Sequence, residues 1–405
     1  MPTDTATPTV KRAPRRGPAA PAKTARKPAG KRVRPVEPTV DDTGWVLLAA
    51  IVAMLCTIGL MMVLSASSVE ALRSYGGAWV FFTRQVMWVA IGAAVLVGAA
   101  LADYHHWRRA VPFLLGGSFV MLVLVLVPGV GITAGGSSRW LGTPSFRIQP
   151  SELAKLAILL FGADLLARRV DLVSDWRSVM RPLLVTTGLL AVLVLVQPDM
   201  GTTLLIFFIV FVLMFVGGVR LVPMATLGTV GSVVSVVLAK VEGYRWERVS
   251  SFRDPFGDFQ NTGYQVAQSL VALGTGHVGG VGLGASRAKW GFLPNAHTDF
   301  IFAIVGEELG LIGTFGVVGL FVAFAVVGVR TALRAPDRFG ALLAAGVTAW
   351  VCGQAFVNMG AVTSLLPVTG VPLPFVSFGG SSLVVTMAAT GILLNVARQA
   401  RRAST

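Results

Sequence analysis

Asp299 is the residue whose type and place in the sequence offer the clearest chemistry. It stands where an apolar run begins that continues to about residue 330. A carboxylate at the N-terminus of a helix is held in its ionised form by the helix dipole and by unpaired N–H groups. An ionised carboxylate can take a proton from an alcohol as a general base. Equally, Asp299 or the preceding Thr298 can cap the helix, and composition alone leaves both roles open.

Other ionisable residues lie inside apolar runs, where they are costly unless they face a partner or a cavity. Glu307 and Glu308 follow Asp299 in the same run. Glu152 and Lys155 are three residues apart, so they share one face of a helix and are expected to form a structural ion pair. A part in positioning a substrate is the alternative for that pair. We expect all four residues to support the site.

The elements that must position these residues are helices that cross a membrane. Of the 405 residues, 54% are hydrophobic and only 13% are charged, against about 25% charged in a soluble protein. The apolar residues form long runs, and a run of roughly 18 or more can span a bilayer as a helix. A β-barrel would instead show short alternating segments. We predict an all-α polytopic membrane protein of about ten transmembrane helices. The predicted spans are 45–65, 79–101, 110–130, 151–167, 182–197, 199–219, 221–240, 299–330, 339–366 and 377–397.

The segments outside the spans differ in composition. Residues 1–44 are rich in Lys, Arg, Pro and Ala and predict a disordered basic tail. The transmembrane domain is expected over 45–397, and 398–405 form a short second tail. A loop at 241–298 is unusually long for a helix connection, which favours a functional role. Its portion 263–273 is mildly amphipathic and predicts a helix at the membrane interface.

The positions of Lys and Arg predict the orientation in the membrane. Basic residues recur in every second loop, at 108–109, 168–181, 220, 330–338 and 398–402. By the positive-inside rule these loops and both termini are cytoplasmic. The net charge of +15 therefore reflects the tail and the cytoplasmic loops, and we expect no nucleic acid as a partner.

Several basic residues fall on the opposite, outer side and so oppose that rule. Arg139, Arg245, Arg248 and Lys289 are the candidates to bind an anionic ligand there, with ordinary solvated loop charge as the alternative. The outer segment 274–279 matches G-x-G-x-x-G, but that motif binds dinucleotides only after a strand of a βαβ unit. Its glycines are expected to permit tight turns and close backbone approach to a ligand or another helix.

Five motifs together resemble the SEDS family of membrane proteins. In chain order they are Gln149–Lys155, Gln197–Thr202 with Asp199 inside it, His297–Ala303, Glu307–Gly310 and Pro372–Ser382. The resemblance covers about 45–397, and the motifs stand in the family's order. Within the family the sequence is most similar to the division branch, FtsW, with RodA the close relative.

The resemblance implies a fold, an activity and partners. It implies a peptidoglycan glycosyltransferase of the bacterial cytoplasmic (inner) membrane, at the division septum, that polymerises lipid II, the undecaprenyl-pyrophosphate-linked disaccharide peptide. The implied partners are a class B penicillin-binding protein, which is a transpeptidase, and other divisome membrane proteins. Asp299 matches the family's essential acidic residue. His297, Ser377 and Ser381 lie in or beside the matched motifs and are candidates for substrate binding, and Asp199 for a supporting role.

The chemistry of such a reaction fits one carboxylate. The acceptor sugar's 4-hydroxyl needs a base, here Asp299, and inversion at an α-linked donor gives a β-1,4 bond. The pyrophosphate leaving group needs its charge neutralised, either by basic side chains or by a divalent cation such as Mg²⁺ or Mn²⁺. Two alternatives stay open at this point: a flippase that moves lipid II across the membrane, and a scaffold without catalysis that recruits a septal transpeptidase.

Overall fold

The structure is a computed structural model, and it describes residues 1, 43–134, 137–143, 146–173, 175–225, 228–229, 231, 254–257 and 263–404. The chain divides into two units, Met1–Val40 and Asp41–Thr405, and the second holds every described helix. Most of the basic tail predicted for residues 1–44 lies outside the described residues.

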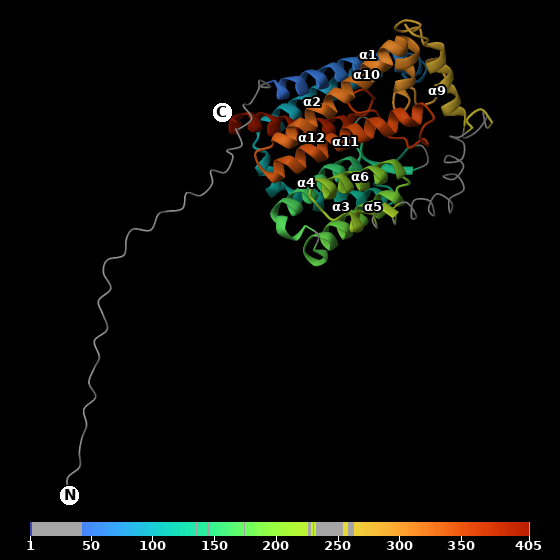
Figure 1. Ribbon diagram of the computed structural model, residues 1–405. Coiled ribbons are helices and arrows are strands. Elements are labelled where there is room, and N and C mark those ends of the chain that lie inside the picture. Colours follow the sequence, from blue (N-terminus) through green and yellow to red (C-terminus); the bar gives the residue numbers. More distant parts are fainter. Residues whose placement is uncertain are drawn as a thin grey trace. The chain divides into compact units, whose positions relative to one another are not determined.

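Helices form most of the described part of the second unit (Figure 1). They are α1 (Gly44–Tyr75), α2 (Val80–Leu101), α3 (Trp107–Leu126), α4 (Pro150–Arg168), α5 (Arg181–Val196), α6 (Met200–Val216), α9 (Tyr264–Thr275), α10 (Ile301–Arg334), α11 (Arg338–Val362) and α12 (Gly380–Ser404). Within the described part of the chain, seven helices are long and apolar enough to cross a membrane, and α6 is a shorter apolar helix. Every predicted span except 221–240 coincides with a helix. That one lies mostly outside the described residues.

Two C-terminal helices form the centre of the bundle. α11 contacts α10 and α12 and also α4 and α6, while α12 packs most extensively on α2. In their apolar segments 83% of α12 and 61% of α11 are buried inside the protein, more than in the other five helices. A Cβ on Gly391 would lie 2.4 Å from the carbonyl oxygen of Leu96, so only glycine permits this close approach of α12 to α2. Most side chains in these two segments therefore face protein rather than lipid.

α10 is interrupted near its start. Gly310 has φ +66° and ψ −158°, which is not helical, and the hydrogen bonds that the helix loses there are replaced by the loop before it. Val281 N–H donates to the carbonyl of Glu307 at 2.9 Å, and Leu311 N–H donates to the carbonyl of His277 at 3.0 Å. Backbone groups freed inside a membrane protein need such internal partners.

The interruption corrects the predicted span 299–330. All 34 residues of α10 as one helix would be about 51 Å long, against a hydrocarbon core of about 30 Å. The part after Gly310 is about 36 Å long and fits a bilayer with some tilt. The part before it, residues 301–308, is buried throughout. It is a separate short helix that is bonded to the loop before it.

The loop between α3 and α4 and the described part of the loop before α10 both contain secondary structure. The first contains a small antiparallel sheet of β1 (Ile132–Ala134), β2 (Ser137–Gly142) and β3 (Arg147–Ile148), in that order. The second contains α9 and a 3₁₀ turn at Ala288–Trp290. α9 agrees with the amphipathic helix predicted at 263–273. It packs on α10 and α11, and its Ser269 Oγ lies 2.8 Å from the carbonyl oxygen of Val362.

Candidate active site

Asp299 lies in the turn immediately before α10. The N-cap of the helix is Phe300, which makes no side-chain capping bond, so neither Thr298 nor Asp299 occupies the cap position. The Asp299 side chain is half-buried, and a Cβ added to Gly370 would lie 3.5 Å from its Oδ2 atom. Gly370 has φ +71°, a conformation that favours glycine. The carboxylate therefore faces a stretch of backbone that carries no side chain.

The turn that carries Asp299 is held by its backbone. The three carbonyl groups of residues 297–299 accept hydrogen bonds from Phe378 N–H at 3.0 Å, from Ser377 Oγ at 2.7 Å and from Asn358 Nδ2 at 2.7 Å, in that order. Two donors come from the segment before α12 and one from α11. The turn is thus fixed against two elements far from it in sequence.

His297 is enclosed by aromatic rings. Only 7% of it is exposed, and its ring centroid lies 4.8 Å from that of Phe81 and 5.7 Å from that of Phe378. Its Nδ1 atom lies 3.4 Å from Glu70 Oε2, an ion-pair distance without hydrogen-bond geometry. Burial lowers the pKa of His297 from the ordinary value of 6.5, while the Glu70 carboxylate opposes that shift. The surroundings therefore favour the neutral ring, and they make His297 a packing residue beside Asp299.

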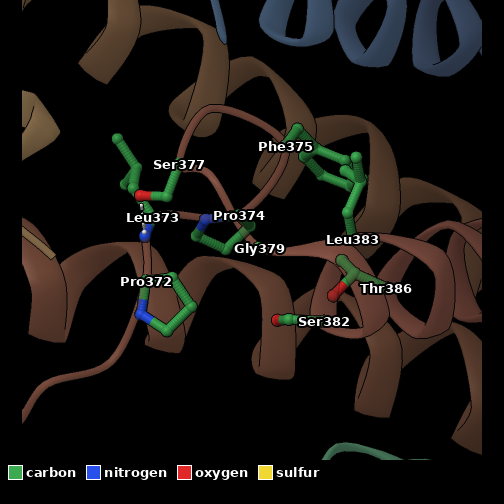
Figure 2. A pocket seen from close by; sticks show the side chains of 9 residues that line it. All are labelled: Pro372, Leu373, Pro374, Phe375, Ser377, Gly379, Ser382, Leu383 and Thr386. Atoms are coloured by element: carbon green, nitrogen blue, oxygen red, sulfur yellow. Dashed lines mark hydrogen bonds between the residues drawn. The ribbon is translucent and has the colours of Figure 1, made fainter. Parts of the chain in front are cut away.

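A pocket opens next to the same segment, between the loop before α12 and the first turns of that helix (Figure 2). Its lining combines prolines and apolar side chains with the hydroxyl groups of Ser377, Ser382 and Thr386. Ser377 has a second task here, because its Oγ accepts a hydrogen bond from Leu373 N–H at 2.8 Å. Of the two predicted substrate-binding serines, Ser377 therefore lines this pocket and also shapes the loop around it.

The second predicted serine, Ser381, belongs to a neighbouring cluster that joins three helix starts. Its Oγ accepts a hydrogen bond from Gln149 N–H at 3.1 Å, just before α4. Gln149 Nε2 in turn donates to Asp199 Oδ2 at 3.2 Å. Asp199 caps α6 through the backbone N–H of Thr202 at 3.0 Å. Asp199 and Ser381 thus hold α4, α6 and α12 together at one end.

Arg139 on β2 also contacts this end of the bundle. Its Nε donates to the carbonyl of Gln197 at 2.9 Å, and its Nη2 donates to the carbonyl of Pro198. The sequence suggested Arg139 as a phosphate ligand. The contacts that the structure gives it are with backbone, and they tie the small sheet to the segment before α6.

Glu307 and Glu308 bind the outer loop rather than a substrate. The Glu307 carboxylate accepts hydrogen bonds from Ser286 Oγ at 2.5 Å, from Arg287 N–H at 2.9 Å and from Ala288 N–H at 3.3 Å. Both glutamates are at most 2% exposed. Their side chains therefore attach the loop to the short helix before Gly310.

Lys289 completes this attachment. Its Nζ atom lies 3.6 Å from Glu308 Oε1 and donates to Ser65 Oγ on α1 at 3.2 Å and to the carbonyl of Gly284 at 2.5 Å. Only 8% of the residue is exposed. The structure thus places this candidate phosphate ligand inside the protein, among acceptors of the chain itself.

The ion pair predicted on α4 is present. Lys155 Nζ lies 2.9 Å from Glu152 Oε1, and both side chains are buried. The ammonium also donates to Gln354 Oε1 at 2.9 Å and lies 5.0 Å from the ring centroid of Trp350, both on α11. The pair therefore links α4 to the central helix.

Some site residues fall outside what the structure describes, and others were not foreseen. Arg245 and Arg248 lie outside the described residues. Sequence reasoning missed Glu70, and it passed over Gln354 and Asn358, which are polar residues four apart in an apolar run. That spacing puts both on one face of a helix and was the available signal.

A divalent cation would find few protein ligands here. Among the described residues there is no group of three or more His, Cys, Asp or Glu side chains that could hold a metal ion. Magnesium is, however, often bound by one or two carboxylates together with substrate phosphates. Asp299 with a pyrophosphate would be such a set.

Fold and site together define a class: a polytopic membrane protein whose half-buried carboxylate is held at one end of the central helix α11. The match to known proteins identifies the class more closely. Residues 46–402 match the model of the FtsW/RodA/SpoVE family, described as cell cycle proteins. The chain belongs to this family.

Named relatives and solved structures agree with that assignment. The chain is 42% identical over 354 residues to a probable peptidoglycan glycosyltransferase FtsW of Geobacter metallireducens, covering 87% of this chain and 93% of that protein. It is 40% identical to the stage V sporulation protein E of Bacillus subtilis, covering 88% and 97%. The structure resembles that of the rod shape determining protein RodA of Thermus thermophilus, with TM-score 0.64, 27% identity and coverage of 87% and 96%. It also resembles a chain of a peptidoglycan synthase complex, with TM-score 0.70, 29% identity and coverage of 89% and 98%.

Proposed function

We propose that this protein is a peptidoglycan glycosyltransferase that polymerises lipid II at the outer face of the bacterial cytoplasmic membrane. Relatives with over 40% identity are named probable peptidoglycan glycosyltransferases, and the chain covers most of their length. The structural observation that carries the proposal is the Asp299 turn. Three consecutive carbonyls are held in place there, so the backbone that carries the carboxylate has a fixed position.

In the proposed reaction Asp299 acts as the general base. The 4-hydroxyl oxygen of the acceptor sugar attacks the anomeric carbon of the donor, and its proton passes to the carboxylate. The bond between the anomeric carbon and the pyrophosphate oxygen breaks, and undecaprenyl pyrophosphate leaves with the electron pair. Attack from the face opposite the leaving group converts the α-linked donor into a β-1,4 bond. The carboxylate must therefore be positioned on the acceptor side of the anomeric carbon.

The leaving pyrophosphate needs positive charge close to it. Because Lys289 and Arg139 contact acceptors of the chain itself, Arg245 and Arg248 are the remaining candidates from the sequence. A bound Mg²⁺ or Mn²⁺, shared between Asp299 and the pyrophosphate, would supply the same neutralisation. Both sources stay predictions, and removing divalent cations with a chelator separates them.

The proposed setting is the division septum, with a class B penicillin-binding protein as transpeptidase partner and other divisome membrane proteins nearby. The likeness to a chain of a peptidoglycan synthase complex supports a partner that cross-links what this protein polymerises. The positive-inside pattern supports cytoplasmic termini, which puts the Asp299 turn outside. That is the side where the wall is built.

Polymerisation of labelled lipid II by the purified protein, in complex with its penicillin-binding partner, tests the proposal. Wild type should give glycan polymer, and Asp299→Ala should give none while still forming the complex. Polymer from both proteins would remove Asp299 from the mechanism. Polymer from neither would contradict the proposed activity, and a lipid II translocation assay in vesicles would then decide between a flippase and a scaffold.

A further inference from the structure

Three side chains on α11 form what we call the α11 ladder: Trp350, Gln354 and Asn358. They are spaced four residues apart, so they lie on one face of the helix. All three are buried, with at most 2% exposed. Trp350 Nε1 donates to Gln354 Oε1 at 2.9 Å, so the lower two members are joined to each other. The ladder runs along a helix face that is otherwise apolar.

The middle of the ladder connects the buried ion pair to the loop before α12. Gln354 Oε1 accepts a hydrogen bond from Lys155 Nζ, and its Nε2 donates to the carbonyl of Pro372 at 2.9 Å. Its amide group is therefore oriented at both ends. Because the ammonium requires the oxygen on its side, the nitrogen must point to the loop.

The top of the ladder contacts the Asp299 turn. Asn358 Nδ2 donates to the carbonyl of Asp299 at 2.7 Å and to the carbonyl of Val371 at 2.8 Å. Both amide hydrogens are thus used, one on each of two segments far apart in sequence. The Val371 contact is one residue from Gly370, the residue that faces the Asp299 carboxylate.

The oxygen of the Asn358 amide helps to explain why this position is an asparagine. Asn358 Oδ1 is buried and has no hydrogen-bond partner among the described residues. A buried amide oxygen without a partner is unfavourable, and an apolar side chain of the same size would avoid that cost. Packing alone does not explain the asparagine, but its two donated hydrogen bonds do.

We propose that Asn358 is a positioning residue for Asp299, and this inference rests on the function proposed above. The carbonyl that it holds is part of the peptide plane next to the Asp299 Cα atom, so holding it fixes the direction in which the carboxylate leaves the backbone. The same amide sets the opposing backbone at Val371. One side chain therefore controls both sides of the gap between the carboxylate and Gly370. A displacement of about 1 Å at a reacting group can reduce a rate by about 10²-fold.

The chain offers a matched control. Asn395 on α12 is also a fully buried asparagine whose Nδ2 donates to a backbone carbonyl of another helix, that of Ala100, at 2.8 Å. It lies roughly 20 Å along α12 from the pocket end of that helix. Its replacement disturbs the same kind of contact away from Asp299, and it also removes the oxygen that accepts hydrogen bonds from Tyr104 N–H at 3.0 Å and from Gln399 Nε2 at 2.9 Å.

The experiment compares Asn358→Leu with Asn395→Leu in the full protein bound to its penicillin-binding partner. Initial rates of polymerisation over a range of lipid II concentrations give kcat and KM, and thermal unfolding in detergent gives Tm. For Asn358→Leu we expect kcat to fall by about 10²-fold with KM within about twofold, because the carboxylate moves but the substrate still binds. For Asn395→Leu we expect both constants within about twofold, at a loss in Tm at least as large, because it also leaves the Tyr104 N–H group without its acceptor.

A second variant keeps the inference testable if Asn358→Leu does not fold. Asn358→Asp has the same size and at most one donor, so it loses at least one of the two hydrogen bonds, and its kcat should fall between wild type and Asn358→Leu. Equal kcat values for the Asn358 and Asn395 variants, or a change in KM alone, would overturn the proposal. So would failure of both Asn358 variants to fold, since that would make the role structural.

Asp299→Asn in the same assay distinguishes a failure of the base role of Asp299 from a failure of the positioning role of Asn358. If it polymerises normally, the assignment of Asp299 as base fails. If it is inactive while Asn358→Leu remains as active as Asn395→Leu, only the positioning role fails.

Discussion

Asp299 and the pair Glu307 and Glu308 lie within ten residues of one another, yet the chain uses them differently. The turn at Asp299 is fixed through its main-chain carbonyls, which accept hydrogen bonds from Asn358 and Ser377 among others. At Glu307 and Glu308 the carboxylates themselves are the acceptors, and they attach the outer loop. The contacts of Glu307 and Glu308 therefore attach a loop, whereas the contacts of the Asp299 turn fix the backbone from which the carboxylate extends.

The largest effect should come from the isosteric change Asp299→Asn. Because it removes the proposed base but keeps the backbone contacts, kcat for lipid II polymerisation should fall by about 10²–10⁴-fold with little change in Tm. Steady-state rates and thermal unfolding of the purified complex measure the two. A large loss in Tm would show that the Asp299 carboxylate stabilises the structure as Glu307 and Glu308 do, and would contradict the difference between them.

A third buried carboxylate extends the comparison to α4. Lys155→Met leaves Glu152 without its cation, and breaking a buried pair in this way costs about 3–5 kcal/mol. We expect a clear loss of thermal stability, measured in detergent. The double variant Glu152→Gln with Lys155→Met should recover part of it, and no recovery would contradict an ion pair as the cause.

Glu307→Gln should lower stability locally. The neutral amide cannot satisfy the N–H groups of Arg287 and Ala288 as the carboxylate does, and each unsatisfied buried donor costs about 1–3 kcal/mol. Hydrogen exchange should become faster in residues 284–291. Asp171→Asn, at an exposed position, is the control and should leave exchange there unchanged.

The smallest effect concerns pH. Since burial lowers the pKa of His297, the folded protein binds fewer protons than the unfolded chain below about pH 6.5, so stability is lost as pH falls through that range. His297→Phe should keep the aromatic packing and reduce this slope of Tm with pH between about 7 and 5. His106→Gln removes an exposed histidine and should leave the slope as it is. An unchanged slope in His297→Phe would mean that other groups carry the acid sensitivity.

Much of the architecture followed from local patterns. Long apolar runs predicted the helices, and the spacing of Glu152 and Lys155 predicted their ion pair, since three residues along a helix bring two side chains together whatever surrounds them. The glycine-rich outer segment was predicted to allow close approach to a helix. Gly276, within that segment, confirms this, because a Cβ on it would clash with the carbonyl oxygen of Gly306 on α10. The helices and the ion pair depend only on neighbours in sequence or on the solvent, whereas the glycines permit a close approach that the packing then uses.

The sequence by itself therefore determined the membrane class, the helices and the carboxylates available for chemistry. Only the tertiary structure decided which groups are engaged elsewhere. Lys289 contacts Glu308 and Ser65, and Arg139 donates to backbone carbonyls, because the fold brings these partners from distant segments next to the two basic side chains. The interruption at Gly310 and the position of Asn358 have the same origin. A hydrogen bond needs its partner within about 3 Å, and for residues so far apart along the chain only the packing of the helices brings the partners that close.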